Sequence, residues 1–169
     1  LNRFDSSQSF ESYLDKSYCK TASLIANSSK AIGVLSDVDQ DSLNSLYFFG
    51  RQLGLAFQVV DDILDFTGND EQLGKPAASD LQSGYLTAPV FFALEENPTL
   101  GDLINGKFLK KDELDQALSL VRDSSAIRKS RELAEKFASE SKDSISWLPD
   151  SPSKTALLEL PEFVISRLY

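Results

Sequence analysis

The chain has 169 residues, 41% of them hydrophobic, which is enough for one domain with a substantial core. Its formal net charge of -9 argues against binding to nucleic acid, which requires clustered Lys and Arg, and equally against an anionic membrane surface. The sequence contains no His, the usual general base and commonest zinc ligand, so any bound metal would be held by oxygen atoms.

The N-terminus and the single cysteine indicate the setting of the chain. The sequence contains no Met, so we expect further residues before Leu1 in the complete translation product. The opening residues do not form a signal peptide, and no run approaches the roughly 18 apolar residues of a membrane-spanning helix. Cys19 cannot form an internal disulfide, and we interpret it as a small buried apolar residue. These features predict a soluble chain.

Two long helical patterns occupy the first part of the chain. Apolar residues recur at helical spacing from Glu11 to about Leu35, and a polar connector follows at residues 36–42. A second helix is predicted from about Ser42 to Phe66, with Gly68 and Asn69 as its stop. Glycine and proline punctuate the polar residues 70–84, which we interpret as a loop.

The helical pattern continues to the C-terminus. Residues 85–96 predict a helix with Pro89 in its first turn or at a kink, and residues 97–110 a loop with a short helix. Three more helices are predicted: 111–124, 124–148 with Ser124 or Ser125 as its cap, and 153–169 with a kink at Pro161. No segment alternates like a strand, so the fold class is predicted to be all-α, a helical bundle.

The segment FQVVDDILDF, residues 57–66, places Asp61, Asp62 and Asp65 among apolar side chains. On a helix these three carboxylates project over one sector about 100° wide. Gln58 lies about one turn earlier on the same side, and Gly54, one turn before that, leaves room for something to approach the backbone. Clustered carboxylates on a buried helix repel one another unless a cation offsets their charge.

Two interpretations of these aspartates stay open. In one, they bind Mg²⁺ or Mn²⁺, because Mg²⁺ typically takes one or two carboxylates, several waters and the oxygens of a substrate phosphate. In the other, they form a solvated charged face or a helix-end cluster, which is the more frequent outcome for such a motif taken alone.

Three further features lie near this motif in the sequence. Lys20 and Thr21 stand in the middle of an apolar helical pattern, where a lysine either reaches to water or neutralises an anion. Lys75 follows Asp65 by ten residues, and Asp80 lies further along the same predicted loop. Each feature alone is ordinary for a surface or a loop.

Taken in order, these elements resemble the second half of the trans-type isoprenyl diphosphate synthases, also called polyprenyl synthetases. The resemblance rests on KTASLIANSSKA, GRQLGLAFQVVDDILDF and LGKPAASDLQSGYLTAP, and continues more weakly to the C-terminus. Within this family, the sequence of these segments is most similar to the long-chain, solanesyl diphosphate synthase branch. The resemblance implies that residues 1–169 are the C-terminal part of one polyprenyl synthetase domain of the isoprenoid synthase fold. The N-terminal half of that domain is absent.

The resemblance also implies roles for individual residues. Asp61, Asp62 and Asp65 would bind Mg²⁺, with Mn²⁺ as a substitute, against the diphosphate of an allylic substrate. Lys20 and Lys75 would contact that diphosphate. Thr21 and Gln58 would place oxygen atoms near a developing allylic cation, and Asp80 would support the site. The implied reaction adds isopentenyl diphosphate to the allylic diphosphate and yields a long polyprenyl diphosphate for quinone side chains.

This sequence departs from the family pattern at two points. The first aspartate-rich motif and the binding site for isopentenyl diphosphate belong to the absent half, so the chain alone is expected to be inactive. Family members commonly carry a lysine where this chain has Tyr85, which puts one diphosphate contact in question.

Two functions of different classes follow from the resemblance. The favoured one is a prenyl-elongating enzyme, because the chain retains three aspartates and both lysines. The alternative is a non-catalytic prenyltransferase-like partner subunit that binds an active homologue. The resemblance further implies a homodimer, in a bacterial cytoplasm or a plastid.

Overall fold

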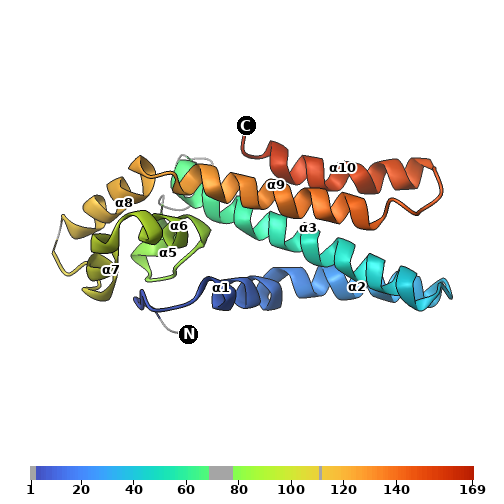
Figure 1. Ribbon diagram of the computed structural model, residues 1–169, viewed down its shortest axis with the longest axis horizontal. Coiled ribbons are helices and arrows are strands. Elements are labelled where there is room, and N and C mark those ends of the chain that lie inside the picture. The colour runs from blue at the N-terminus through green and yellow to red at the C-terminus, as the bar shows by residue number, and fades with distance from the viewer. Residues whose placement is uncertain (1–2, 69–77, 111) are drawn as a thin grey trace. The chain divides into compact units, whose positions relative to one another are not determined.

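The computed structural model describes residues 3–68, 78–110 and 112–169, and every regular element in these ranges is a helix (Figure 1). The prediction of an all-α protein is therefore confirmed for the described residues. The elements are α1 (Phe10–Ser17), the π-helical segment η1 (Tyr18–Ala22), α2 (Ser23–Leu35), α3 (Gln40–Thr67), α5 (Ser79–Gln82), α6 (Ala88–Glu96), α7 (Pro98–Asn105), α8 (Glu113–Asp123), α9 (Ala126–Ser144) and α10 (Pro152–Ser166).

The helices form two compact units. The first unit comprises residues 1–13 and 61–132, and the second comprises residues 14–60 and 133–169. Helix α3 contributes its first part to the second unit and its last two turns to the first. Within the described ranges, every helix is too short or too polar to traverse a lipid bilayer.

The predicted helix 11–35 is present but contains a π-helical turn that periodicity did not reveal. The backbone N–H of Ser23 donates to the carbonyl of Tyr18, five residues earlier, so η1 holds one residue more than an α-turn. Cys19 lies on this turn and is exposed, so the prediction that it is buried was wrong. The extra residue shifts the side chains of the π turn relative to a regular helix.

Helix α3 extends the predicted helix 42–66 by two residues at its start and by one at its end. Asp39 starts it, because its carboxylate accepts a hydrogen bond from the backbone N–H of Ser42 at 2.9 Å. Residues 69–77 of the predicted loop lie outside the described residues. The rest of that loop corrects the prediction, because Ser79–Gln82 form the short helix α5.

Proline and serine start the later helices largely as predicted. Pro89 stands in the first turn of α6, which settles the alternative of a kink there. The hydroxyl of Ser124 accepts a hydrogen bond from the N–H of Ala126 at 3.1 Å, at the start of α9. Helix α10 continues through Pro161 to Ser166.

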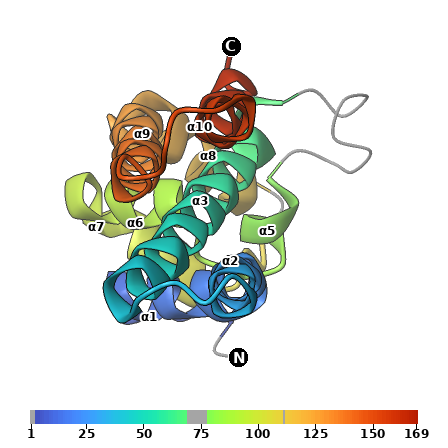
Figure 2. The ribbon, with the colours of Figure 1, turned by 90° about the vertical axis from the view of Figure 1, so that its right-hand side faces the viewer.

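Small residues allow close helix packing in the second unit. Figure 2 shows α3 between α2 on one side and α9 and α10 on the other. A β-carbon built on Gly54 would lie 2.4 Å from the Cα of Ala22, and one on Gly50 would lie 2.6 Å from the carbonyl oxygen of Ile25. Across α3, the hydroxyl of Ser141 donates to the carbonyl of Phe49 at 3.0 Å. Glycine is therefore required where α3 meets η1 and α2.

A separate hydrophobic core fills the first unit. Its buried members come from the end of α3 and from α5 to α9: Phe66, Ala78, Leu81, Leu86, Val90, Ala93, Leu100, Ile104, Ala117, Val121 and Ala126. Phe66 lies one residue after Asp65, so the last turn of α3 packs into this core. The aspartate motif is thus carried by a helix end with a firm hydrophobic support.

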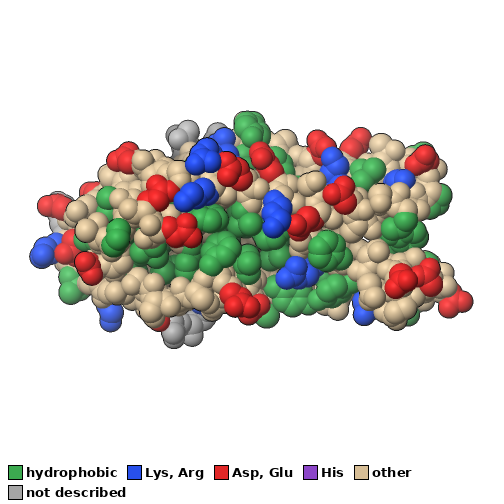
Figure 3. Space-filling model, viewed as in Figure 1, with side chains coloured by type: hydrophobic (Ala, Val, Ile, Leu, Met, Phe, Trp, Pro, Cys, Tyr) green, Lys and Arg blue, Asp and Glu red, His purple; other side chains and the backbone are tan. Residues whose placement is uncertain are grey.

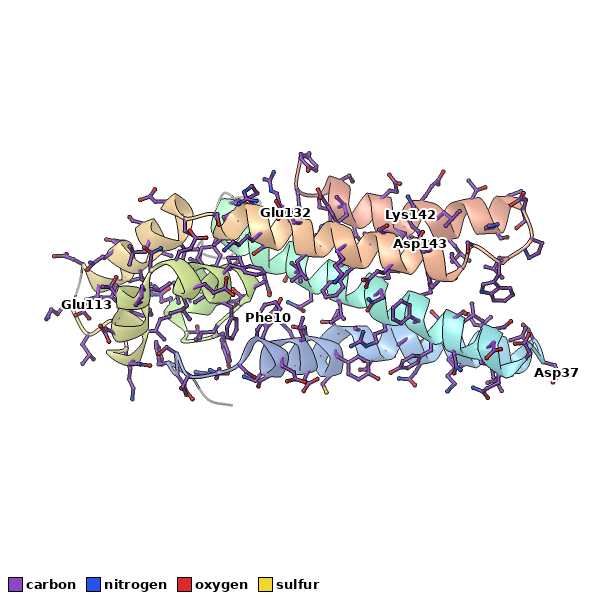
Figure 4. The ribbon with its side chains drawn as sticks, viewed as in Figure 1. Phe10, Asp37, Glu113, Glu132, Lys142 and Asp143 are labelled. Carbon is purple, nitrogen blue, oxygen red and sulfur yellow. The ribbon has the colours of Figure 1, made fainter. Side chains whose placement is uncertain are left out.

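The surface of α9 and α10 carries mixed charges. Acidic and basic side chains are interspersed over these helices on the face drawn in Figure 3. Lys142, labelled on α9 in Figure 4, forms an ion pair with Glu162 of α10 at 2.6 Å. Exposed pairs of this kind contribute at most about 1 kcal/mol, so they do not decide the fold.

The surroundings of Glu96, at the end of α6, predict that the stability of the fold depends on pH. Hydrogen bonds from the hydroxyl and the backbone N–H of Ser125, together with Lys129 at 3.0 Å, lower the pKa of Glu96 from 4.5 to about 2. Since the folded-state pKa is lowered, the ionised carboxylate stabilises the fold above its ordinary pKa, and this contribution is lost as the pH falls toward 2. We expect Glu96→Gln to lower the melting temperature at neutral pH.

The difference in melting temperature between Glu96→Gln and the parent should narrow as the pH falls from about 5 to about 3. Glu95→Gln is the matched control, because Glu95 contacts Lys129 at 3.5 Å and its side chain is 65% exposed. Thermal denaturation followed by circular dichroism at several pH values tests this. A difference in melting temperature that stays constant over this pH range would contradict the lowered pKa of Glu96.

Candidate active site

The three aspartates of the motif lie in different surroundings on α3. Asp61 is exposed, whereas Asp62 and Asp65 are 2% and 1% exposed. Consecutive residues of an α-helix differ by about 100° in direction, so Asp61 faces solvent while Asp62 faces the interior of the first unit. The sequence placed all three in one sector, and the structure shows that the edge of the buried face passes between Asp61 and Asp62.

Asp62 is held by a tyrosine from α1. The hydroxyl of Tyr13 donates to Oδ2 of Asp62 at 2.7 Å, and Tyr13 itself is only 5% exposed. A buried carboxylate requires hydrogen-bond donors to replace lost water. Tyr13 supplies one of them.

Asp65 is held by α5. Ser79 donates its hydroxyl to Oδ1, and the backbone N–H of Asp80 donates to Oδ2, each at 3.2 Å. The N–H of Ala78 also donates to the backbone carbonyl of Asp65 at 2.6 Å. Ala78 has φ of 56°, in the left-handed region, and this turns the chain into α5. Asp80 therefore supports the motif through its backbone, while the role of its side chain stays a prediction.

The arrangement fits a metal ion that takes few ligands from the protein. Among the residues that the structure describes, no group of three or more Asp, Glu, Cys or His side chains is placed to hold a metal ion together. One exposed carboxylate, Asp61, beside two anchored ones suits Mg²⁺, which keeps several waters and takes further oxygens from a phosphate. The ligand preferences of Mg²⁺ thus fit coordination by Asp61 better than coordination by all three aspartates together.

Thr21 and Gln58 meet in the second unit. The hydroxyl of Thr21 donates to Oε1 of Gln58 at 2.8 Å. Gln58 is 6% exposed, and Lys20, next to Thr21 on the π-helical turn, is exposed. The prediction that Gly54 leaves room for close approach is confirmed, because the Ala22 backbone occupies that space. The spacing of small residues therefore brings the turn that carries Lys20 and Thr21 against α3.

Two further positions were connected with the predicted diphosphate contacts, Lys75 and Tyr85. Lys75 lies outside the described residues, so its position stays a prediction. Tyr85, where the resemblance implies a lysine, contacts Arg3: the guanidinium lies 4.7 Å from the ring centroid and donates to the hydroxyl at 2.5 Å. The backbone N–H of Tyr85 also donates to the carbonyl of Asp80 at 2.9 Å.

Sequence reasoning missed Tyr13 and Ser79 as partners of the aspartates. The buried positions of the first helical stretch include Tyr13, Ser17, Ala22 and Ala26, and a helical wheel with one residue inserted would have placed Tyr13 on the buried face. Nothing in the sequence pairs its hydroxyl with a carboxylate 49 residues away. Ser79 carried the sequence pattern of a loop residue and no other signal.

Comparison with known proteins finds relatives that match nearly the whole chain. The chain is 54% identical over 169 residues to a protein named prenyl transferase from Synechocystis sp., covering 100% of this chain and 52% of that protein. It is 44% identical over 165 residues to solanesyl diphosphate synthase 2, chloroplastic, from Arabidopsis thaliana, covering 98% of this chain and 40% of that protein. The chain thus spans about half the length of these relatives.

The structural comparison agrees. The crystal structure of heptaprenyl diphosphate synthase from Staphylococcus aureus matches with a TM-score of 0.91 at 32% identity, over 97% of this chain and 52% of that one. This confirms the predicted fold of the isoprenoid synthase type. The family model described as polyprenyl synthetase matches residues 1–121. On its sequence, its fold and its matched relatives, the chain belongs to the polyprenyl synthetase family.

Proposed function

We propose that the protein containing this chain is a Mg²⁺-dependent prenyltransferase. It condenses isopentenyl diphosphate with an allylic diphosphate and makes a long, solanesyl-like polyprenyl diphosphate for quinone side chains. Family membership and the names of the relatives support the reaction class. The observation that carries the proposal is Asp61, an exposed carboxylate on a helix end whose neighbours Asp62 and Asp65 are anchored.

We assign the metal contact to Asp61 and supporting roles to Asp62 and Asp65. Lys20, exposed on the π-helical turn, and Lys75 would neutralise the diphosphate. When bound, Mg²⁺ would withdraw electron density from the diphosphate oxygens and make the diphosphate a better leaving group. Lysines and metal together offset the negative charge that grows on the diphosphate as the bond breaks.

Thr21 and Gln58 are proposed to stabilise the positive charge on the allylic carbon. Their hydrogen bond at 2.8 Å fixes two side-chain oxygens next to each other before substrate binds. Oxygens fixed in this way stabilise a nearby carbocation without having to reorient during the reaction. The low exposure of Gln58 keeps bulk water away from its amide, which strengthens the electrostatic effect.

In the proposed reaction, the released diphosphate takes up both an electron pair and a proton. The carbon–oxygen bond of the allylic diphosphate breaks, and both electrons leave with the diphosphate. The double bond of isopentenyl diphosphate attacks the allylic carbon and forms the new carbon–carbon bond. A proton is then lost to the released diphosphate, which restores a double bond, so the absence of His from this chain is no obstacle.

Partners and location extend the same proposal. The substrates would be an allylic diphosphate and isopentenyl diphosphate, and the protein would form a homodimer. A plastid or a bacterial cytoplasm is the proposed location. It is supported by the relative named chloroplastic and by the relative from Synechocystis sp..

The deciding experiment uses the protein as its gene encodes it. Purified protein is incubated with Mg²⁺, an allylic diphosphate and isotopically labelled isopentenyl diphosphate, and the products are separated by chain length. Labelled long-chain polyprenyl diphosphates that disappear on addition of a chelator support the proposal. A gene product of only this length that forms no labelled product, but binds an active prenyltransferase, would identify the non-catalytic partner subunit instead.

A further inference from the structure

The hydrogen bond between Tyr13 and Asp62 joins two buried groups that the proposed reaction does not use directly. The donor and acceptor oxygens are 2.7 Å apart, within the usual range for a hydroxyl that donates to a carboxylate, and both residues are at least nine-tenths buried. A carboxylate in such a site is stabilised by a well-aligned hydroxyl. The hydrogen bond therefore favours a single rotamer of Asp62.

Aromatic neighbours fix the direction of the tyrosine hydroxyl. The Tyr13 ring lies 5.4 Å from Phe10 and 5.7 Å from Phe91, measured between centroids. Phe10, labelled at the start of α1 in Figure 4, also contacts Phe91 at 5.7 Å and Phe92 at 5.4 Å. Rings packed at such distances attract one another and restrict rotation. The cluster thus packs the Tyr13 ring of α1 against α6.

The last two turns of α3 are held at two points. Tyr13 binds Asp62 from α1, and Ser79 with the Asp80 N–H binds Asp65 from α5. The two anchored residues lie three positions apart, so together they fix the rotation of this helix end about its axis. Asp61, next to Asp62, then has a defined direction into solvent.

We infer that Tyr13 is a positioning residue for the metal and diphosphate site, acting through Asp62 on the placement of Asp61. The inference rests on the proposed function. Without the hydroxyl, the Asp62 carboxylate would lose this hydrogen bond to α1, and the helix end would sample several orientations. Binding of a metal ion and a diphosphate at Asp61 would then be weaker, because it would include the free-energy cost of selecting one orientation of the helix end.

The test removes the hydroxyl and keeps the ring. Tyr13→Phe preserves the aromatic cluster. Tyr47→Phe is the matched control, because Tyr47 lies on α3, the helix of Asp62, and its hydroxyl forms a hydrogen bond with that of Tyr18 at 2.6 Å. The gene-encoded protein is titrated with Mn²⁺ in the presence of an unreactive allylic thiodiphosphate. Bound Mn²⁺ is followed by electron paramagnetic resonance, which requires no turnover.

We expect Tyr13→Phe to weaken Mn²⁺ binding about tenfold, the lower end of the range for outer partners of metal ligands. Tyr47→Phe should change it less than about twofold. A double-mutant cycle adds Asp62→Ala, which removes the acceptor, and in its presence Tyr13→Phe should have little further effect on Mn²⁺ affinity. Melting temperatures, measured in parallel, separate lost positioning from lost stability.

Equal effects of the two tyrosine variants on Mn²⁺ affinity, or full additivity with Asp62→Ala, would overturn the inference. Parent protein that binds Mn²⁺ and the thiodiphosphate but never forms a polyprenyl product would refute the proposed function, while the comparison of variants would still judge Tyr13. Parent protein that binds neither would refute both.

Discussion

Asp61→Asn is expected to lower the kcat of prenyl transfer about a thousandfold, the upper end of what the loss of one preorganised electrostatic contact to a reacting group costs. The substitution keeps the size of the side chain and removes the charge that would hold Mg²⁺ against the diphosphate. Because Asp61 is exposed, the folded structure does not depend on burying it, and stability should change little. Steady-state rates with labelled isopentenyl diphosphate, together with chemical denaturation, measure both effects.

Asp41→Asn is the control for the change of net charge, since Asp41 is exposed in the first turn of the same helix. It should leave kcat within about twofold of the parent, because surface substitutions away from special features have small effects. Asp65→Asn should behave differently from both, because it disturbs the hydrogen bonds from Ser79 and Asp80 and so lowers stability as well as activity. Full activity in Asp61→Asn would remove this residue from the site.

Gly54→Ala is expected to destabilise the protein by about 1–3 kcal/mol, the usual cost of inserting a carbon into a packed interior. The new β-carbon would lie 2.4 Å from the Cα and 2.7 Å from the Cβ of Ala22, so the backbone of η1 would have to move away from α3. This cost exceeds the gain in helix propensity of about 1 kcal/mol. The free energy of unfolding in urea measures it.

Gly101→Ala is the matched control for helix propensity. Gly101 lies within α7, and the atom nearest to an added β-carbon is the Ser6 hydroxyl oxygen at 3.3 Å, a contact that a small shift of this side chain relieves. This variant should be at least as stable as the parent, by up to about 1 kcal/mol. In Gly54→Ala we also expect a lower kcat, because moving η1 displaces Thr21 from Gln58. Equal stability of both alanine variants would contradict the prediction, because it would show that η1 can move away from α3 without loss of stability.

The helical elements could be predicted because each depends on local signals. Apolar spacing indicated α3, the position of Pro89 indicated the start of α6, and Ser124 indicated the start of α9. Helix α5 was missed because its four residues are too few to show a period. The π-helical turn was missed for a related reason, since one inserted residue changes the spacing only slightly over two turns.

The sequence by itself determined that the chain is helical, that three aspartates share one helix, and that Lys20, Thr21 and Gln58 accompany them. Tertiary structure decided which aspartate faces water, because burial depends on what packs against each side of α3 and not on its own spacing. It also decided that Tyr13 and α5 hold Asp62 and Asp65. Those contacts join residues 49 and 14 positions apart, and no periodicity in the chain encodes a pairing over such separations.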